Sequence, residues 1–250
     1  MLKKRVIARL DIKNEFVIKG IQLEGLRKIG DPNEIAKSYY VSGVDEIIFM
    51  DSVAAYYDRN SLSSIISMAS EDIFIPITVG GGIRSIADIQ KALNSGADKV
   101  AINTQALKSP EFITEASKVF GSQCIVVSIE AKKVGSQWHA YFDNGREDSG
   151  RKVSEWAQEA ELLGAGEIMI TSVDKEGTKR GMDKALIDNL INLVSVPLIV
   201  SGGVGCMDDI LETFISGVDA VALASVLHYD ILHLGQIKDS MKQAGLKVRS

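Results

Sequence analysis

Two carboxylates stand directly after apolar segments of similar composition. Asp11 ends RVIARLD and Glu130 ends IVVSIE, 119 residues further on. A carboxylate on each side of a bound molecule is the arrangement that paired general acid and base catalysis requires. The same side chains also suit salt bridges or helix caps, so this pattern alone leaves both roles open.

Two glycine-rich turns form the second chemical signal. Gly81 and Gly82 follow the apolar run PITV, and Gly202 and Gly203 follow PLIV. Backbone N–H groups in such turns bind phosphate, although glycines also let helices pack closely on strands. Each turn is followed by a segment that ends in a hydroxyl, at Thr104 and at Ser225. Two matching turns favour phosphate binding and predict a ligand with a phosphate at each end.

These turns belong to an internal repeat with an offset of 121 residues. The stretch 74–104 (FIPITVGGGIRSIADIQKALNSGADKVAINT) aligns without a gap with 195–225 (SVPLIVSGGVGCMDDILETFISGVDAVALAS). Each copy shows an apolar strand, a glycine turn, a helical pattern and a second strand, which is a βαβ unit. We therefore predict one domain over residues 1–250. Its fold is an α/β (β/α)8 TIM barrel built from two duplicated half-barrels, about 1–120 and 121–250.

Active sites of such barrels lie where the strands end. The strand ends and the loops that follow them give further candidates for binding a ligand and its phosphates: Asp51, Gly81, Gly82, Asn103, Thr104, Thr171, Asp174, Gly177, Gly202, Gly203, Ala224 and Ser225. Residues 12–30 form a long connection near this end, and a long loop in a compact barrel often acts as a lid. Lys19 on this lid is expected to contact a phosphate or a developing anion.

Four charged residues occupy the opposite ends of the strands. Arg5, Glu46, Lys99 and Glu167 begin predicted strands, and we expect them to close the barrel floor with a ring of ion pairs. A structural plug is the ordinary role of a barrel floor. A gate is the alternative, and spacing alone does not decide between them.

Composition restricts the classes of function. A formal net charge of −5 argues against a nucleic-acid binder that works through bulk electrostatics. The absence of a long apolar run argues against a membrane protein, and we expect a cytoplasmic protein with no metal site and no cofactor. The two cysteines, Cys124 and Cys206, are expected to be small core residues.

From end to end, the chain resembles the cyclase subunit of imidazole glycerol phosphate synthase of histidine biosynthesis. The matching stretches are LDIK, VIKG, GDP, TVGGGI, GADKV, INT, FGSQ, IVV, GAGEI, GTK and SGG. The resemblance implies a reaction in which a bis-phosphorylated aminoimidazole-carboxamide ribonucleotide and ammonia give imidazole glycerol phosphate and aminoimidazole carboxamide ribotide. It also implies a partner, a glutaminase subunit that docks on the floor and sends ammonia through the barrel.

The resemblance assigns roles to individual positions. Asp11 matches the catalytic aspartate, Lys19 the lid lysine, and Asp98 a contact for the glutaminase. The floor residues match the ammonia gate: Arg5, Glu46, Lys99 and Glu167. Gly82, Asn103 and Thr104 resemble one phosphate site, and Gly203 with Ser225 the other.

Three positions depart from the family pattern. The second catalytic carboxylate is Asp in the family and Glu130 here, the motif D-x-D-G-T has Glu176 in place of its second Asp, and Arg9 replaces a small residue such as Cys. A buried guanidinium needs a partner, and Glu130 is a candidate for that partner. These departures motivate an alternative, a cyclase-like paralogue that relays ammonia for sugar amidation in surface-glycan biosynthesis. A third hypothesis is that the chain is a non-catalytic scaffold that binds only the glutaminase.

Overall fold

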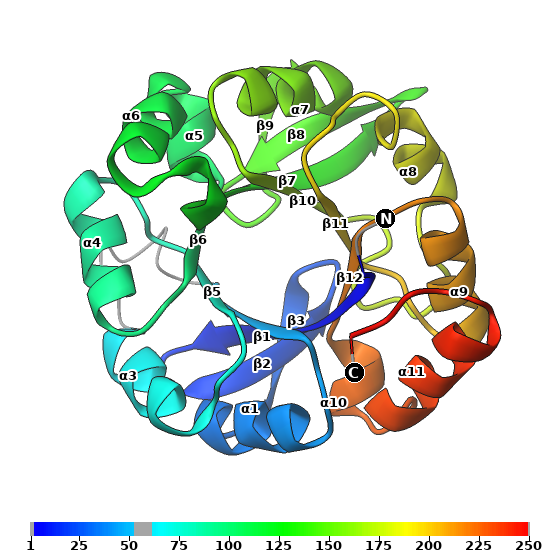
Figure 1. The fold of residues 1–250 in the computed structure, drawn as a ribbon. Coiled ribbons are helices and arrows are strands. Elements are labelled where there is room, and N and C mark those ends of the chain that lie inside the picture. Colours follow the sequence, from blue (N-terminus) through cyan, green and yellow to red (C-terminus); the bar gives the residue numbers. More distant parts are fainter. Residues whose placement is uncertain (1–2, 53–61, 250) are drawn as a thin grey trace.

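A closed barrel of parallel strands forms the centre of the molecule. The computed structural model describes residues 3–52 and 62–249. Within these residues, eight strands pair in parallel around a ring, in the order β1, β4, β5, β6, β7, β10, β11 and β12, and β12 returns to β1. Helices surround the ring (Figure 1). The predicted (β/α)8 barrel is confirmed, whereas the domain limits stay a prediction.

The strands and helices alternate along the chain as the sequence pattern indicates. Their bounds are β1 (Arg5–Lys13), β2 (Phe16–Ile21), β3 (Glu24–Gly30), α1 (Pro32–Val41), β4 (Glu46–Asp51), α3 (Ser63–Asp72), β5 (Ile77–Gly80), α4 (Ile86–Asn94), β6 (Lys99–Ile102), α5 (Thr104–Lys108), α6 (Glu111–Phe120), η1 (Ser122–Cys124), β7 (Ile125–Val134), β8 (Gln137–Phe142), β9 (Glu147–Lys152), α7 (Val153–Leu162), β10 (Glu167–Ser172), α8 (Lys184–Leu190), β11 (Leu198–Ser201), α9 (Met207–Ile215), β12 (Ala220–Leu223), α10 (Ser225–His228) and α11 (Leu234–Gln243).

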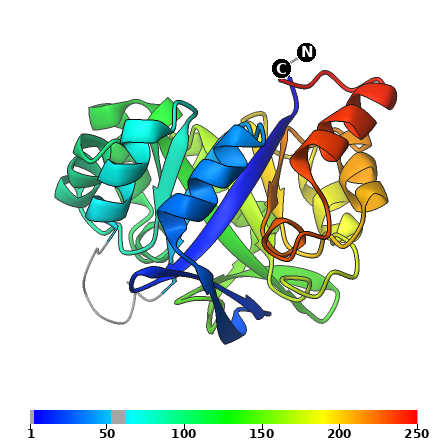
Figure 2. The same cartoon turned by 90° about the horizontal axis from the view of Figure 1, so that it is seen from below.

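Two antiparallel excursions depart from the simple barrel. The predicted lid is a hairpin of β2 and β3 that pairs with the end of β1. The second excursion consists of β8 and β9, where β8 pairs with the part of β7 from Glu130 onward and β9 pairs with β8. Both project from the end of the barrel opposite to the chain termini (Figure 2).

The repeat seen in the sequence recurs in the hydrogen bonds. Asp98 Oδ2 accepts from the backbone N–H of Ile77 over 2.8 Å, and Asp219 Oδ2 accepts from Leu198 over 3.1 Å. The 121-residue offset of the repeat relates the two pairs, since Ile77 corresponds to Leu198 and Asp98 to Asp219. The carboxylates of Asp88 and Asp209 likewise accept backbone N–H groups at the starts of α4 and α9. The offset therefore preserves backbone contacts as well as residue types.

Side-chain alternation divides the core into two layers. One layer lies between the strands and the helices, and its largest fully buried side chain is Trp156 on α7. The other fills the barrel interior and consists of Ile7, Ile48, Ala101, Val126, Met169, Ile199, Ala220 and Ala222. Because successive strand residues point to opposite faces, the residues two positions along from this inner layer also point into the barrel. This places Arg9, Ser128 and Thr171 above it.

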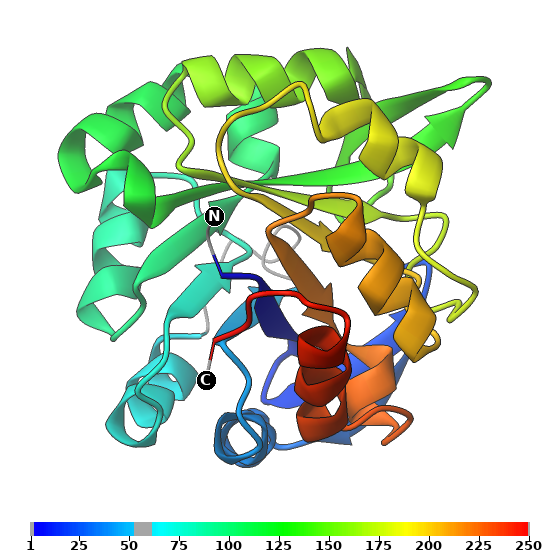
Figure 3. The ribbon, with the colours of Figure 1, turned by 45° about the vertical axis from the view of Figure 1, so that its right-hand side comes forward.

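The segments near the two ends of the chain lie on the same side of the barrel, at its floor (Figure 3). Lys4 forms a parallel bridge with Val248, and the Lys4 N–H donates to Lys247 O over 2.7 Å. Cys124 is half-buried against the core, but Cys206 is exposed at the start of α9, and both are free thiols. The expected core position of Cys206 is therefore wrong, because this residue begins a surface helix. No helix in the described ranges combines the length and apolar character needed to cross a bilayer.

Candidate active site

The two predicted catalytic carboxylates lie on opposite sides of the barrel mouth. Asp11 is on β1 and Glu130 on β7, and these strands are four steps apart around the eight-stranded ring. Both side chains belong to the carboxyl ends of parallel strands. The opposition inferred from the sequence is thus present in the fold.

Asp11 is held in its ionised form by two cations. Arg9 Nε donates to Asp11 Oδ1 over 2.8 Å, and Lys19 Nζ lies 3.5 Å from Asp11 Oδ2. The side chain is almost fully buried, and burial by itself would raise its pKa. The charges of Arg9 and Lys19 outweigh that effect and lower the pKa of Asp11 below its usual value.

Arg9 reaches across the barrel interior. Its Nη1 donates to Thr171 Oγ1 on β10 over 2.8 Å, while its Nε binds Asp11 on its own strand. The expected hydrogen-bonded partner, Glu130, is not the one found. Asp11 is the nearer carboxylate because it lies two positions along the same face of β1, and the charge of Glu130 acts on Arg9 only at longer range.

Glu130 is in a different electrostatic setting. Its Oε2 accepts a hydrogen bond from the backbone N–H of Gly145 over 2.7 Å, in the turn between β8 and β9. Burial raises the pKa of Glu130, and the Gly145 N–H and Arg9 only partly oppose that rise, so the pKa reaches about 7. The two carboxylates at this mouth therefore differ in protonation near neutral pH.

Lys19 is buried rather than exposed on an open lid. Only 3% of the residue is accessible, and its ammonium pairs with Glu176 Oε1 in the loop after β10. Burial would lower the pKa of Lys19, but Glu176 and Asp11 raise it overall. The Gln22 N–H also donates to Glu176 O over 2.8 Å. The hairpin of β2 and β3 is thus closed onto the barrel, in place of the loop expected from the sequence.

The first predicted phosphate site lines a cavity of about 290 Å³. Asp51, Gly81, Gly82, Asn103 and Thr104 all border this cavity, together with Arg9 and Glu130. Gly81 and Gly82 have φ values of 89° and 72°. A Cβ on Gly81 would lie 2.2 Å from Asp51 O, so this backbone conformation and its close approach both require glycine.

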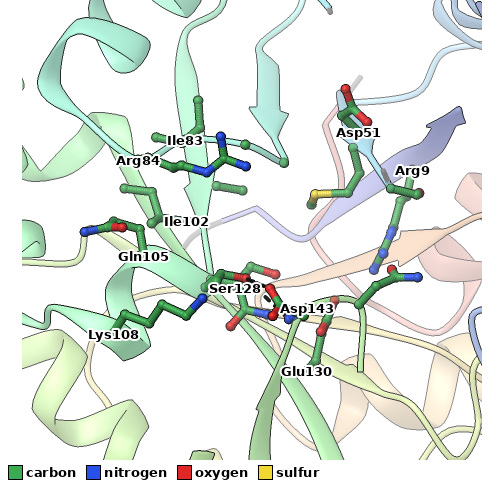
Figure 4. A pocket seen from close by; sticks show the side chains of 18 residues that line it. Arg9, Asp51, Ile83, Arg84, Ile102, Gln105, Lys108, Ser128, Glu130 and Asp143 are labelled. Atoms are coloured by element: carbon green, nitrogen blue, oxygen red, sulfur yellow. Dashed lines mark hydrogen bonds between the residues drawn. The ribbon is translucent and has the colours of Figure 1, made fainter. Parts of the chain in front are cut away.

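Sequence reasoning missed two cations in this cavity. Arg84 and Lys108 both line it, and the Lys108 side chain extends toward Asp143 (Figure 4). Their positions carry a recognisable signal, since Arg84 follows the glycine turn and Lys108 lies one helical turn after Thr104. Their positive charge makes the cavity suitable for an anionic group.

The second predicted phosphate site is built in the same way but is narrower. Gly177, Gly202, Gly203, Ala224 and Ser225 line a pocket of about 20 Å³. Ala224 has φ −133° and ψ −80°, close to the −122° and −81° of Asn103, its counterpart in the repeat. A wider groove of about 540 Å³ adjoins this site and is bordered by Lys19, Arg27, Lys179 and Tyr229.

Two predicted site residues have backbone partners instead of facing the first cavity. Asp174 Oδ2 accepts from the N–H of Lys133 over 2.8 Å and so supports the extension of β7. Asp98 accepts from Ile77 at the floor and is exposed. Their roles in ligand and partner binding stay predictions.

The floor residues form the predicted ring of ion pairs. Arg5 Nη1 lies 2.9 Å from carboxylate oxygens of both Glu46 and Glu167. Lys99 Nζ lies 3.2 Å from Glu46 and 3.0 Å from Glu167. Arg249 adds a fifth charge, 3.5 Å from Glu46. Each carboxylate is therefore shared between cations, and the gate role of the ring stays a prediction.

The closed barrel and the opposed carboxylates at its mouth define an enzyme of the (β/α)8 class. Across the described ranges, no cluster of three or more His, Cys, Asp or Glu side chains is arranged to hold a metal ion. A family model described as "Histidine biosynthesis protein" matches residues 5–233.

Curated relatives cover the chain from end to end. "Imidazole glycerol phosphate synthase subunit HisF" of Streptococcus sanguinis is 45% identical over 251 residues, all of both chains. The protein of that name from Legionella pneumophila is 53% identical over 210 residues, 84% of this chain and 99% of the relative. That from Helicobacter hepaticus is 44% identical over 249 residues, 99% of each chain. The chain belongs to the HisF family.

Proposed function

We propose that this protein is the cyclase subunit of imidazole glycerol phosphate synthase. It uses ammonia to convert a bis-phosphorylated aminoimidazole-carboxamide ribonucleotide into imidazole glycerol phosphate and aminoimidazole carboxamide ribotide. The observation that carries the proposal is the placement of two carboxylates with opposite pKa shifts between two repeat-related glycine pockets. Membership of the HisF family supports the same reaction.

The pKa difference between Asp11 and Glu130 supports the chemical roles that we propose. Asp11 is ionised over the whole neutral range and acts as the general base. Glu130, with a pKa of about 7, carries a proton for a substantial fraction of the time and acts as the general acid. Lys19, the third predicted catalytic residue, places its charge beside Asp11 and is positioned to stabilise a developing anion.

The two pockets hold the two phosphates of the substrate. One phosphate lies against Gly82, Asn103 and Thr104, near Arg84 and Lys108, and the other lies against Gly203 and Ser225. Binding both ends fixes the reacting centre between Asp11 and Glu130. Such positioning can supply a large part of a catalytic rate.

A glutaminase subunit docks on the floor as the partner of this chain. Side chains at or just beyond the carboxyl ends of the helices are exposed and apolar there, including Phe74 at 78%, Leu162 at 88% and Ile215 at 68%. Exposed apolar side chains around a charged centre are typical of a protein interface. Ammonia passes the ring of Arg5, Glu46, Lys99 and Glu167 and then the small inner side chains of Ala101 and Ala222. We place this activity in the cytoplasm.

A direct assay tests the reaction. Purified protein, the bis-phosphorylated substrate and an ammonium salt should produce imidazole glycerol phosphate, and Asp11→Asn should abolish this product. Absence of product at saturating substrate and ammonium would contradict the proposal. The family comparisons do not favour the alternative reaction, ammonia relay for sugar amidation.

A further inference from the structure

A turn of the β8–β9 excursion rests on the first phosphate pocket. Asp143 Oδ1 lies 3.4 Å from Thr104 Oγ1, and the Asp143 N–H donates to the same hydroxyl oxygen over 3.4 Å. Asn103 Nδ2 donates to Tyr141 O over 3.1 Å and holds the adjoining strand in place. A carboxylate of the chain itself is therefore bound to a residue of the proposed phosphate site.

The charges of this cavity explain why an acidic side chain is stable there. Arg84, Lys108 and Asp143 line the same cavity, and the Lys108 side chain extends toward Asp143 (Figure 4). The Lys108 ammonium lies 5.2 Å from the centroid of the Phe142 ring, next to Asp143 in the chain. A site with two cations and the Thr104 hydroxyl favours an anion. The Asp143 carboxylate lines the same cavity and can serve as that anion without a bound ligand.

The same turn also touches the proposed general acid. Gly145, two residues after Asp143, donates its N–H to Glu130 Oε2 over 2.7 Å. Three successive residues of the turn have positive φ, 50° at Asp143, 60° at Asn144 and 73° at Gly145. The first two are not glycine, so the turn adopts a conformation that its contacts must maintain. Loss of the contact between Asp143 and Thr104 therefore weakens the restraint that keeps the Gly145 N–H hydrogen-bonded to Glu130.

We propose that Asp143 occupies the place of a substrate phosphate at Thr104, and that an arriving phosphate displaces the 143–145 turn and releases Glu130 from Gly145. A dianionic phosphate and the Asp143 carboxylate repel each other, so both cannot remain at Thr104. Displacement of the 143–145 turn therefore couples phosphate binding at Thr104 to the release of Glu130, the proposed proton donor, from its hydrogen bond with Gly145. Asp143 acts in this scheme as a positioning residue, and the inference rests on the proposed function for the identity of the phosphate.

The test uses inorganic phosphate and needs no turnover. In isotopically labelled full-length protein, the amide resonances of Thr104 and Gly145 are followed during a phosphate titration. We expect both resonances to shift with the same saturation curve. Asp143→Asn should tighten phosphate binding at Thr104 about tenfold, because it removes one like charge from the pocket. Glu147→Gln, an exposed charge change in the same excursion, should stay within about twofold of the unaltered chain.

Each contrary result overturns the inference. A Gly145 amide that does not move while Thr104 saturates would show that the turn stays in place. Equal phosphate affinity in Asp143→Asn and Glu147→Gln, or no phosphate effect at Thr104, would show that Asp143 does not occupy the site. The titration of the unaltered chain remains decisive if Asp143→Asn does not fold. Because product formation is measured separately, an inactive cyclase and an immobile turn are distinguishable.

Discussion

Arg9 and Asp11 form a buried ion pair between two residues of the same strand face, with Arg9 Nε 2.8 Å from Asp11 Oδ1. Both side chains are at least nine-tenths buried, so neither charge is well solvated. The guanidinium keeps the proposed general base ionised and crosses the barrel to Thr171. Arg9, which the resemblance marks as a departure from the family pattern, thus takes part in the electrostatics of the active site.

Removing Arg9 should destabilise the protein by leaving Asp11 incompletely paired. We expect Arg9→Met to lower the free energy of unfolding by about 3 kcal/mol at pH 7, measured by denaturant titration. The loss should shrink below pH 4. Because the pKa of Asp11 is lowered by its cations, the Asp11 carboxyl protonates more readily in Arg9→Met, and protonation removes the unpaired charge.

A double variant provides the control for Arg9. Arg9→Met combined with Asp11→Asn removes both charges and should recover much of the stability. If the double variant is as unstable as Arg9→Met alone, the ion pair does not account for the loss.

The rate should fall at alkaline pH because Glu130 must carry a proton. Its pKa is raised to about 7, so the protonated fraction falls about tenfold for each pH unit well above that value. At a fixed concentration of free ammonia, kcat should follow this descending limb. Glu130→Gln should lower kcat by about 100-fold or more and abolish the limb. A rate that is constant between pH 6 and pH 9 would rule out Glu130 as the general acid.

The ion pair between Lys19 and Glu176 should control the opening of the β2–β3 hairpin. Glu176→Gln removes the charge that holds Lys19, so we expect about tenfold faster amide hydrogen exchange in residues 16–21. Glu24→Gln, an exposed change in the same hairpin, should leave exchange unchanged. Equal rates of amide hydrogen exchange in Glu176→Gln and Glu24→Gln would show that this ion pair does not hold the hairpin closed.

The floor ring should matter for glutamine-driven turnover and not for turnover with ammonium salt. Lys99→Met removes a cation shared by Glu46 and Glu167. With the glutaminase subunit present, product formed per glutamine hydrolysed should fall about fivefold or more. The rate with ammonium salt should stay within about twofold, because the ring is far from Asp11 along β1.

A second floor lysine serves as the control for Lys99. Lys238 pairs with Asp45 outside the ring, at 2.7 Å, so Lys238→Met should leave both rates nearly unchanged. Equal effects of the two variants would assign Lys99 a general structural role.

Strand-level features were predictable because they are local. Alternation along RVIARLD places Arg5, Ile7, Arg9 and Asp11 on one face of β1, and Ile7 belongs to the inner layer of the barrel. Repeat-related glycines and aspartates indicated the paired turns, since positive φ and N–H capping depend on the immediate sequence. The ion-pair ring followed because each member begins a strand.

Contacts between distant segments were not predictable in this way. Arg9 had several carboxylates within its reach, and backbone geometry selected Asp11 while Gly145 took Glu130. Lys19 was expected to contact a phosphate or a developing anion, but the β2–β3 hairpin places it against Glu176. Asp143 reached Thr104 because an excursion of another strand folds over that pocket.

The sequence by itself determined the barrel, its repeat and the residues that stand at the strand ends, because strand periodicity and turn chemistry are encoded over a few residues. Only the tertiary structure decided which of those residues pair, which are buried and which differ in pKa. Those properties depend on side chains from strands and hairpins that are remote in the chain and meet only when the ring closes.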